Sequence, residues 1–117
     1  MIINGVEFDI DFTDADLIER IDVKSKEVYK EAEELEKRKK DISPAEGIRQ
    51  ECKIVKDFLD YVFGDGTSEK LFGNKNSLME CLKVYEDIIK ERDRQLNNFK
   101  EVVDKYSPDR LKRWIYW

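Results

Sequence analysis

The sequence predicts a mainly α-helical domain of three to four helices, one of them long, with a small N-terminal β-hairpin. Apolar residues recur at spacings of three and four over long stretches of the 117 residues. Two Ser-x-x-Glu sequences mark helix starts, and alternation with a period of two is confined to the first twelve residues. A chain of this length suits one core, so we expect a single domain over residues 1–117.

Residues 1–12 predict the hairpin. Asn4-Gly5 is a strong turn signal because both positions tolerate positive φ. After the turn, apolar residues alternate with acids, which puts them on opposite faces: Val6, Phe8, Ile10 and Phe12 against Glu7, Asp9 and Asp11. An isolated hairpin is marginal in water, so we expect its apolar face to pack on helices or on another chain.

A first helix is expected over 14–40, with Thr13 or Asp14 as its N-cap. Its apolar positions follow helical spacing: Leu17, Ile18, Ile21, Val28, Ala32 and Leu35. The stripe is thin, because Lys24 and Ser25 interrupt it and residues 33–41 are nearly all charged. We therefore expect its far end to project into solvent or to bind a partner.

A second helix is expected over 44–63, since Ser43-Pro44-Ala45-Glu46 combines a capping box with proline at the first helical position. Its apolar face is the best core candidate: Ala45, Ile48, Cys52, Val55, Leu59 and Val62. Gly64 and Gly66 permit the chain to end this helix and turn sharply. Leu71 and Phe72 then give the connection an apolar foot that can dock on the helices.

A long helix is expected over 77–106, beginning at a second capping box formed by Ser77 and Glu80. It carries a heptad pattern broken only by an arginine: Leu78, Leu82, Tyr85, Ile89, Arg92, Leu96, Phe99, Val103 and Tyr106. Such a pattern indicates either core packing or self-association. A continuous helix here is about 43 Å long at about 1.5 Å per residue, longer than a compact domain of this size requires.

Ser107-Pro108 ends or kinks the long helix, and residues 108–117 form an aromatic C-terminal segment. Tryptophan and tyrosine are enriched at interface hot spots, so we expect a partner or oligomer contact here, with docking within the chain as the alternative. The candidate contact residues are Leu96, Phe99, Val103, Tyr106, Trp114, Ile115, Tyr116 and Trp117.

The charge is unevenly distributed. The net charge of −5 comes entirely from residues 1–16, which hold Glu7, Asp9, Asp11, Asp14 and Asp16 and no base. The rest of the chain is balanced, so nothing electrostatic favours direct nucleic-acid binding. The acids are interpreted as solvated charges, because their spacing lacks the pattern of a calcium loop.

Nothing in the sequence indicates an enzyme or a cofactor. The chain has no histidine, and it has no phosphate-binding glycine loop. Cys52 and Cys81 belong to apolar helical patterns without metal-ligand spacing, which predicts buried, reduced thiols. No signal sequence or membrane-spanning run is present, so we expect no membrane association and a cytoplasmic location.

Two segments carry a resemblance to a known family. Phe8 to Asp16, with Asp14-Ala15-Asp16, precedes a charged helix containing Glu19-Arg20, and Phe63-Gly64-Asp65-Gly66-Thr67 leads to Leu71-Phe72-Gly73. Over residues 1 to about 105, this pattern resembles a family of small uncharacterised proteins from phages and prophages of Gram-positive bacteria. That family is similar in size and setting to tail assembly chaperones, which bind the tape-measure protein before the tail tube polymerises around it.

The resemblance implies a non-enzymatic tail-morphogenesis factor, active in the host cytoplasm, that binds a tape-measure or other tail protein and forms homo-oligomers. The alternative is a phage-encoded inhibitor of a host defence or regulatory protein, acting through the acidic N-terminal face of Glu7, Asp9, Asp11, Asp14 and Asp16. A third, enzymatic hypothesis requires a divalent cation at the N-terminal aspartates.

Overall fold

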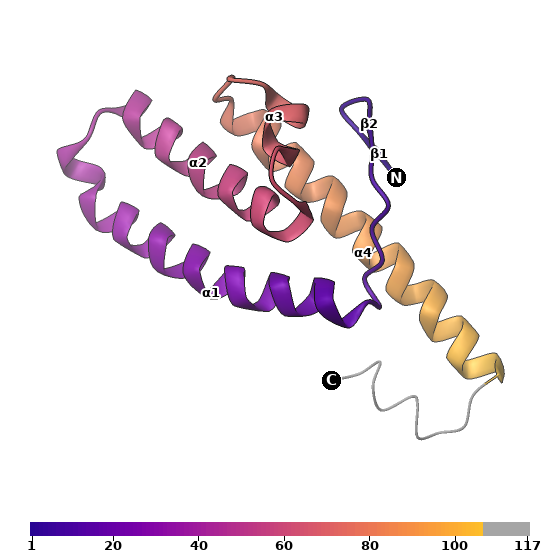
Figure 1. Cartoon of the computed structure of the whole chain (residues 1–117). Helices are drawn as coiled ribbons and strands as arrows, with labels where there is room; N and C mark the ends of the chain where they lie inside the picture. The colour runs from indigo at the N-terminus through magenta and orange to yellow at the C-terminus, as the bar shows by residue number, and fades with distance from the viewer. Residues whose placement is uncertain (107–117) are drawn as a thin grey trace.

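The structure is a computed structural model, and it describes residues 1–106. These residues form four α-helices and one antiparallel two-stranded hairpin, so the predicted fold class is confirmed (Figure 1). The molecule is elongated, with a Cα radius of gyration of 16.9 Å. A compact chain of this length would have a radius near 13 Å.

The hairpin is built as the sequence predicts. Strands β1 (Ile2–Ile3) and β2 (Val6–Glu7) pair antiparallel, with Ile3 opposite Val6. Asn4 and Gly5 form the turn with φ values of 49° and 77°. Pairing stops at Glu7, yet the alternation continues through the extended residues that follow, because Ile10 and Phe12 are buried while their acidic neighbours are exposed.

Helix α1 (Ala15–Arg38) continues into a short 3₁₀ turn, η1 (Lys39–Asp41). Leu17 and Leu35 are its buried residues, whereas Ile18, expected on the same face, is exposed. Lys24 does not break the packed face. Its side chain is 12% exposed and donates a hydrogen bond to Glu27 (2.9 Å), and its amino group lies 5.8 Å from the ring centre of Tyr61. The aliphatic stem of a lysine can cover apolar surface while its charge stays hydrated.

Helix α2 (Pro44–Phe63) begins at the predicted cap, where the Glu46 amide donates to Ser43 Oγ (3.1 Å). It ends at Gly64, whose φ of 113° few other residues adopt. The buried residues of α2 are Cys52, Ile54, Leu59 and Val62. Ala45 and Ile48 were expected in the core and are exposed instead. Ile48 lines an open groove beside the first turns of α2.

The glycine-rich connection contains a short helix, α3 (Thr67–Phe72). Asp60 of α2 accepts hydrogen bonds from the Ser68 amide (2.8 Å) and the Ser68 hydroxyl (2.9 Å), which satisfies free donors at the start of α3. Leu71 and Phe72 are buried, so the expected apolar foot does dock on the core.

Helix α4 (Leu78–Tyr106) completes the fold. Helix α2 packs against α1, α3 and α4, and it is therefore the shared support of the structure. In Figure 1 the second half of α4 extends away from the other helices. The core cluster combines residues 3–12 with the start of α1 and with α2, α3 and α4: Ile3, Ile10, Phe12, Leu17, Cys52, Leu59, Val62, Leu71, Phe72, Cys81, Val84 and Ile88.

Candidate protein-binding surfaces

Helix α4 presents two apolar faces. Its packed face, Cys81, Val84 and Ile88, is almost completely buried, with exposed fractions of 0%, 1% and 7%. The second face begins with the residues that directly follow Cys81, Val84 and Ile88 in the sequence. One residue corresponds to a rotation of about 100° around the helix axis. We call this second face the α4 stripe: Leu82, Tyr85, Ile89, Leu96 and Phe99.

The α4 stripe is largely open to solvent. Leu82, Tyr85 and Leu96 are 53%, 46% and 38% exposed, and Ile89 and Phe99 are half-buried. These residues belong to the predicted heptad pattern, for which core packing and self-association were both expected alternatives. The exposure of Leu82, Tyr85 and Leu96 does not fit core packing. Over the first half of α4 the core uses the preceding residue instead, namely Cys81, Val84 and Ile88. Tyr85 makes a T-shaped ring contact with Phe58 of α2, with the ring centroids 6.5 Å apart.

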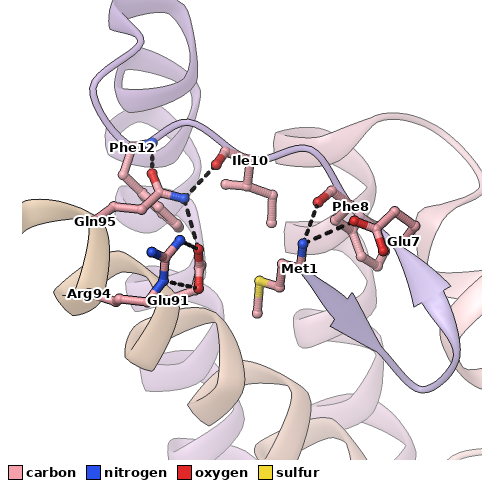
Figure 2. A network of polar contacts seen from close by, with 8 residues as sticks. All are labelled: Met1, Glu7, Phe8, Ile10, Phe12, Glu91, Arg94 and Gln95. Carbon is pink, nitrogen blue, oxygen red and sulfur yellow. Dashed lines mark hydrogen bonds and ion pairs between the residues drawn. The ribbon is translucent and has the colours of Figure 1, made fainter. Parts of the chain in front are cut away.

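A polar clamp determines which face of α4 points inward (Figure 2). The Gln95 amide accepts a hydrogen bond from the Phe12 amide (2.8 Å) and donates one to the Ile10 carbonyl (2.6 Å). Because both backbone groups belong to the segment after the hairpin, Gln95 holds that segment along α4. Leu96, the next residue, is thereby left facing away from it.

Glu91 supports the clamp from one helical turn earlier. It accepts a hydrogen bond from Gln95 (3.2 Å) and forms an ion pair with Arg94. The Arg94 guanidinium lowers the pKa of Glu91 to about 2, and the Gln95 hydrogen bond contributes to the same shift. Glu91 is therefore a carboxylate at neutral pH, which is the form that accepts from Gln95. Figure 2 shows these side chains converging below the N-terminal segment.

The N-terminal segment is fixed at two further points. The α-amino group of Met1 bonds Glu7 Oε1 (3.1 Å) and the Phe8 carbonyl (3.2 Å), as Figure 2 shows. At the hairpin turn, the Asn4 side chain donates to the Leu71 carbonyl of α3 (3.3 Å). The hairpin turn is therefore bonded to α3, and the segment after the hairpin is bonded to α4. The apolar face of residues 3–12 packs on helices of the same chain.

A second apolar surface is a groove of about 380 Å³ at the turn between α1 and α2. Its apolar lining comes from three helices and one connection: Leu35, Ile42, Ile48 and Leu78. Gly47 forms part of the wall, where an added Cβ would make an ordinary van der Waals contact, 3.8 Å from Ile42 Cδ1. We call this the turn groove.

Three of the five predicted acidic residues share a separate hollow of about 340 Å³. Asp9, Asp11 and Asp14 line it together with Arg20, whose guanidinium also donates to the Val62 carbonyl (3.0 Å). Glu7 lies apart at the hairpin, and Asp16 lies in the first turn of α1. Hydrogen bonds from Thr13 lower the pKa of Asp11.

The acidic hollow does not have the geometry of a metal site. Within residues 1–106, no three acidic, cysteine or histidine side chains are grouped so that they could hold a metal ion. The cation that the enzymatic hypothesis requires therefore has no ligand set in the described part of the chain.

The remaining predicted contact residues are divided between two locations. Val103 is buried at 2% exposure, so it does not contribute to the exposed stripe, and Tyr106 is the last residue of α4. Trp114, Ile115, Tyr116 and Trp117 lie outside the described residues.

Comparison with protein families identifies the family to which the chain belongs. A family model matches residues 4–115, nearly the whole sequence. The chain belongs to DUF6673, a family of unknown function. No curated protein and no solved structure matches it. Among the helices of residues 1–106, none combines the length and the apolar character that a membrane span requires.

Two cysteines meet in the core of this DUF6673 member. Cys52 of α2 and Cys81 of α4 are both completely buried, and neither forms a disulfide. Burial raises the pKa of Cys81 to about 12, and contact with Cys52 adds to the shift. The thiolate, which is the reactive form, is therefore suppressed. Buried thiols were predicted from the sequence, and the structure places them as packing groups.

Sequence reasoning missed two residues that shape these surfaces. Gln95 resembles any other polar residue of a charged helix, and only its contacts 83 and 85 positions away reveal it as a clamp. Gly47 gave a detectable signal, because glycine inside a helix costs roughly 0.5–1 kcal/mol relative to alanine. Gly47 stands near the start of α2 and lines the turn groove.

Proposed function

We propose that this DUF6673 member is a non-enzymatic protein-binding factor that holds a helical partner on the α4 stripe. The observation that supports the proposal is the exposure of Leu82, Tyr85 and Leu96 along one face of a 29-residue helix. Partner helices are recognised through apolar anchors at spacings of three and four, and the stripe has that spacing.

The position of the stripe favours a helix as the occupant. Its apolar residues run along α4 over several turns, from Leu82 to Phe99, about 26 Å at about 1.5 Å per residue. A small ligand would need a closed pocket, whereas a helix pairs along a continuous exposed line. Arg92 interrupts the stripe and can select for a partner with an acid at the facing position.

The resemblance to phage proteins supplies the more specific form of the proposal. The partner is then the tape-measure protein or another tail protein of the same phage, and the factor acts as a tail assembly chaperone in the host cytoplasm. Self-association of the chain is part of this proposal, and the C-terminal aromatic residues are its support.

The test is affinity capture of the tagged, full-length protein from an induced lysogen, with partners identified by mass spectrometry. We expect recovery of a tape-measure or tail-tube protein. A double substitution on the stripe, L82E with L96E, should abolish that recovery, because it places two charges in the apolar contact. N98E introduces the same charge at an exposed position off the stripe and should leave recovery unchanged. Failure to recover a tail protein, or equal recovery with the double variant, would contradict the proposal.

A second candidate function uses the acidic hollow. Because Asp9, Asp11 and Asp14 line one hollow, they could bind a basic surface on a host defence or regulatory protein. Binding of this kind weakens as ionic strength rises, since screening is strong at exposed charges. Capture of a host nuclease or DNA-binding protein that is lost in D9N/D14N, and at 0.5 M salt, would favour this candidate over the first.

A further inference from the structure

The turn groove is an apolar surface that residues 1–106 leave open. Its volume of about 380 Å³ lies at the lower end of the range for ligand pockets, roughly 300–1,000 Å³. Three helices contribute to it, so its shape is fixed by the fold rather than by one loop. The groove is distinct from the α4 stripe, although Leu78 at the start of α4 belongs to its lining.

We propose that the turn groove receives the C-terminal aromatic segment, residues 111–117, of a second copy of this chain. The segment consists of Leu111, Lys112, Arg113, Trp114, Ile115, Tyr116 and Trp117, and it holds both tryptophans of the protein. This inference specifies the self-association that the proposed function includes and rests on that part of it.

The chemistry of the two surfaces is complementary. Large aromatic side chains are the anchors that most often fill apolar interface pockets, and the groove offers leucine and isoleucine walls. Residues 107–117 carry three bases against one acid. The groove edge carries two acids, Glu36 and Glu51, against one base, Lys39. Opposite charges at the edge of an apolar contact favour the correct partner and speed its association.

The length of the chain favours a second copy. Leu78 lines the groove and Tyr106 ends the same helix, so the two lie about 42 Å apart at about 1.5 Å per residue. Trp114 follows Tyr106 by eight residues, which span at most about 29 Å when fully extended. Trp117 reaches at most about 40 Å by the same measure. Trp114 therefore falls short of its own groove, and Trp117 reaches only the groove edge, with the chain fully extended.

An interface of this kind joins two different surfaces. Each copy offers one C-terminal segment and one groove, so association is heterologous and proceeds head to tail, either closing into a ring or continuing. In the competing arrangement, the C-terminal segment docks on the α4 stripe of its own chain. Leu96 and Phe99 lie within about 15 Å of the end of α4, which is close enough for that contact. The two arrangements differ in their dependence on concentration.

Tryptophan fluorescence tests the proposal directly, because Trp114 and Trp117 are the only tryptophans and so report on this segment alone. The acceptor is the full-length variant W114A/W117A, which has no tryptophan and retains an intact groove. Dilute wild-type protein should show a red-shifted emission that moves to the blue and saturates as this acceptor is added. When G47L or I48D is introduced into the acceptor protein, the blue shift should need at least tenfold more acceptor, because G47L fills the groove and I48D places a charge in it. G47A adds only a methyl group and is the matched control that keeps the effect, and circular dichroism confirms that each acceptor is folded.

Every other outcome overturns the proposal. A blue-shifted emission that does not change with dilution or acceptor indicates docking within the chain. A red-shifted emission under all conditions indicates that the segment binds no copy of the protein. An acceptor effect that survives both G47L and I48D indicates another surface, and its loss in an L82E/L96E acceptor would identify the α4 stripe. None of these results alters partner capture from a lysogen, so this inference and the tail-protein role can fail separately.

Discussion

The two faces of α4 lie one residue apart in the sequence and differ in how far the fold buries them. Ile88 packs in the core and Ile89, its neighbour, is half-buried beside the exposed Tyr85. Both faces are apolar, and both repeat at spacings of three and four. The longer and more regular repeat belongs to the exposed face, which shows that regular spacing alone does not identify the side of a helix that a domain buries.

The difference has a physical origin in the partners of each face. The packed face meets α2 and the hairpin segment over only the first half of α4, where Cys81, Val84 and Ile88 join the core cluster. Beyond Ile88, Gln95 replaces apolar packing with hydrogen bonds to the N-terminal segment. Within residues 1–106 the stripe is packed only in part and continues past the clamp, with Leu82, Tyr85 and Leu96 exposed, as expected of a surface that binds another molecule.

The largest effect is expected when the same substitution, isoleucine to alanine, is made on each of the two faces of α4. I88A should lower the free energy of unfolding by about 2–4 kcal/mol, because it removes buried methyl groups and leaves a cavity. I89A is the matched control and should cost less than about 1 kcal/mol, since its side chain is already partly hydrated. Urea unfolding followed by circular dichroism measures both. Equal losses would mean that the two faces are packed alike.

A smaller effect is expected at the clamp. Q95A should lower the free energy of unfolding by about 1–3 kcal/mol, because the Phe12 amide and the Ile10 carbonyl lose their partner in a partly buried place. The exposed Asn98 serves as the control, and N98A should be nearly neutral. Hydrogen exchange at the Phe12 amide should quicken in Q95A and stay unchanged in N98A. An unchanged exchange rate in Q95A would show that the segment is held without Gln95.

Acidification should weaken the same clamp by a smaller amount, because Arg94 is exposed and solvent screens the ion pair. The folded pKa of Glu91, about 2, lies below its unfolded value near 4.3. The stabilisation is therefore complete above about pH 5 and is lost as the pH falls toward 2. The wild-type protein should lose more stability than E91Q over that interval, as thermal melts at each pH would measure. Parallel pH profiles for the two proteins would contradict this assignment.

The packed face can also be probed with no change in stability. Cys52 and Cys81 should react with a thiol reagent at neutral pH only as fast as the core opens, because both are buried and the pKa of Cys81 is raised to about 12. Reaction in denaturant should be immediate and involve both thiols. A fast reaction of the native protein would indicate that α2 and α4 separate readily. The I88A variant should react faster than I89A, which links this probe to the first comparison.

The local structure of this protein was predictable from its sequence. The Asn4-Gly5 turn, the Ser43 cap and the end of α2 at Gly64 were all predictable, because each depends on the conformational preferences of one or two residues. The buried cysteines and the docked Leu71 and Phe72 followed from periodicity and composition. The presence of a helix and the position of a hairpin turn depend mainly on interactions between residues close together in the sequence.

Tertiary structure alone decided which apolar face of α4 is buried and where the surfaces lie. Gln95 selects that face through bonds to residues more than 80 positions away, and no local pattern encodes such a contact. Ile48 became a groove wall rather than a core residue because three separate segments leave a space beside it. Burial depends on which other segments pack against a residue. Spacing and hydrophobicity therefore indicate which residues can be buried, and the tertiary contacts determine which of them are.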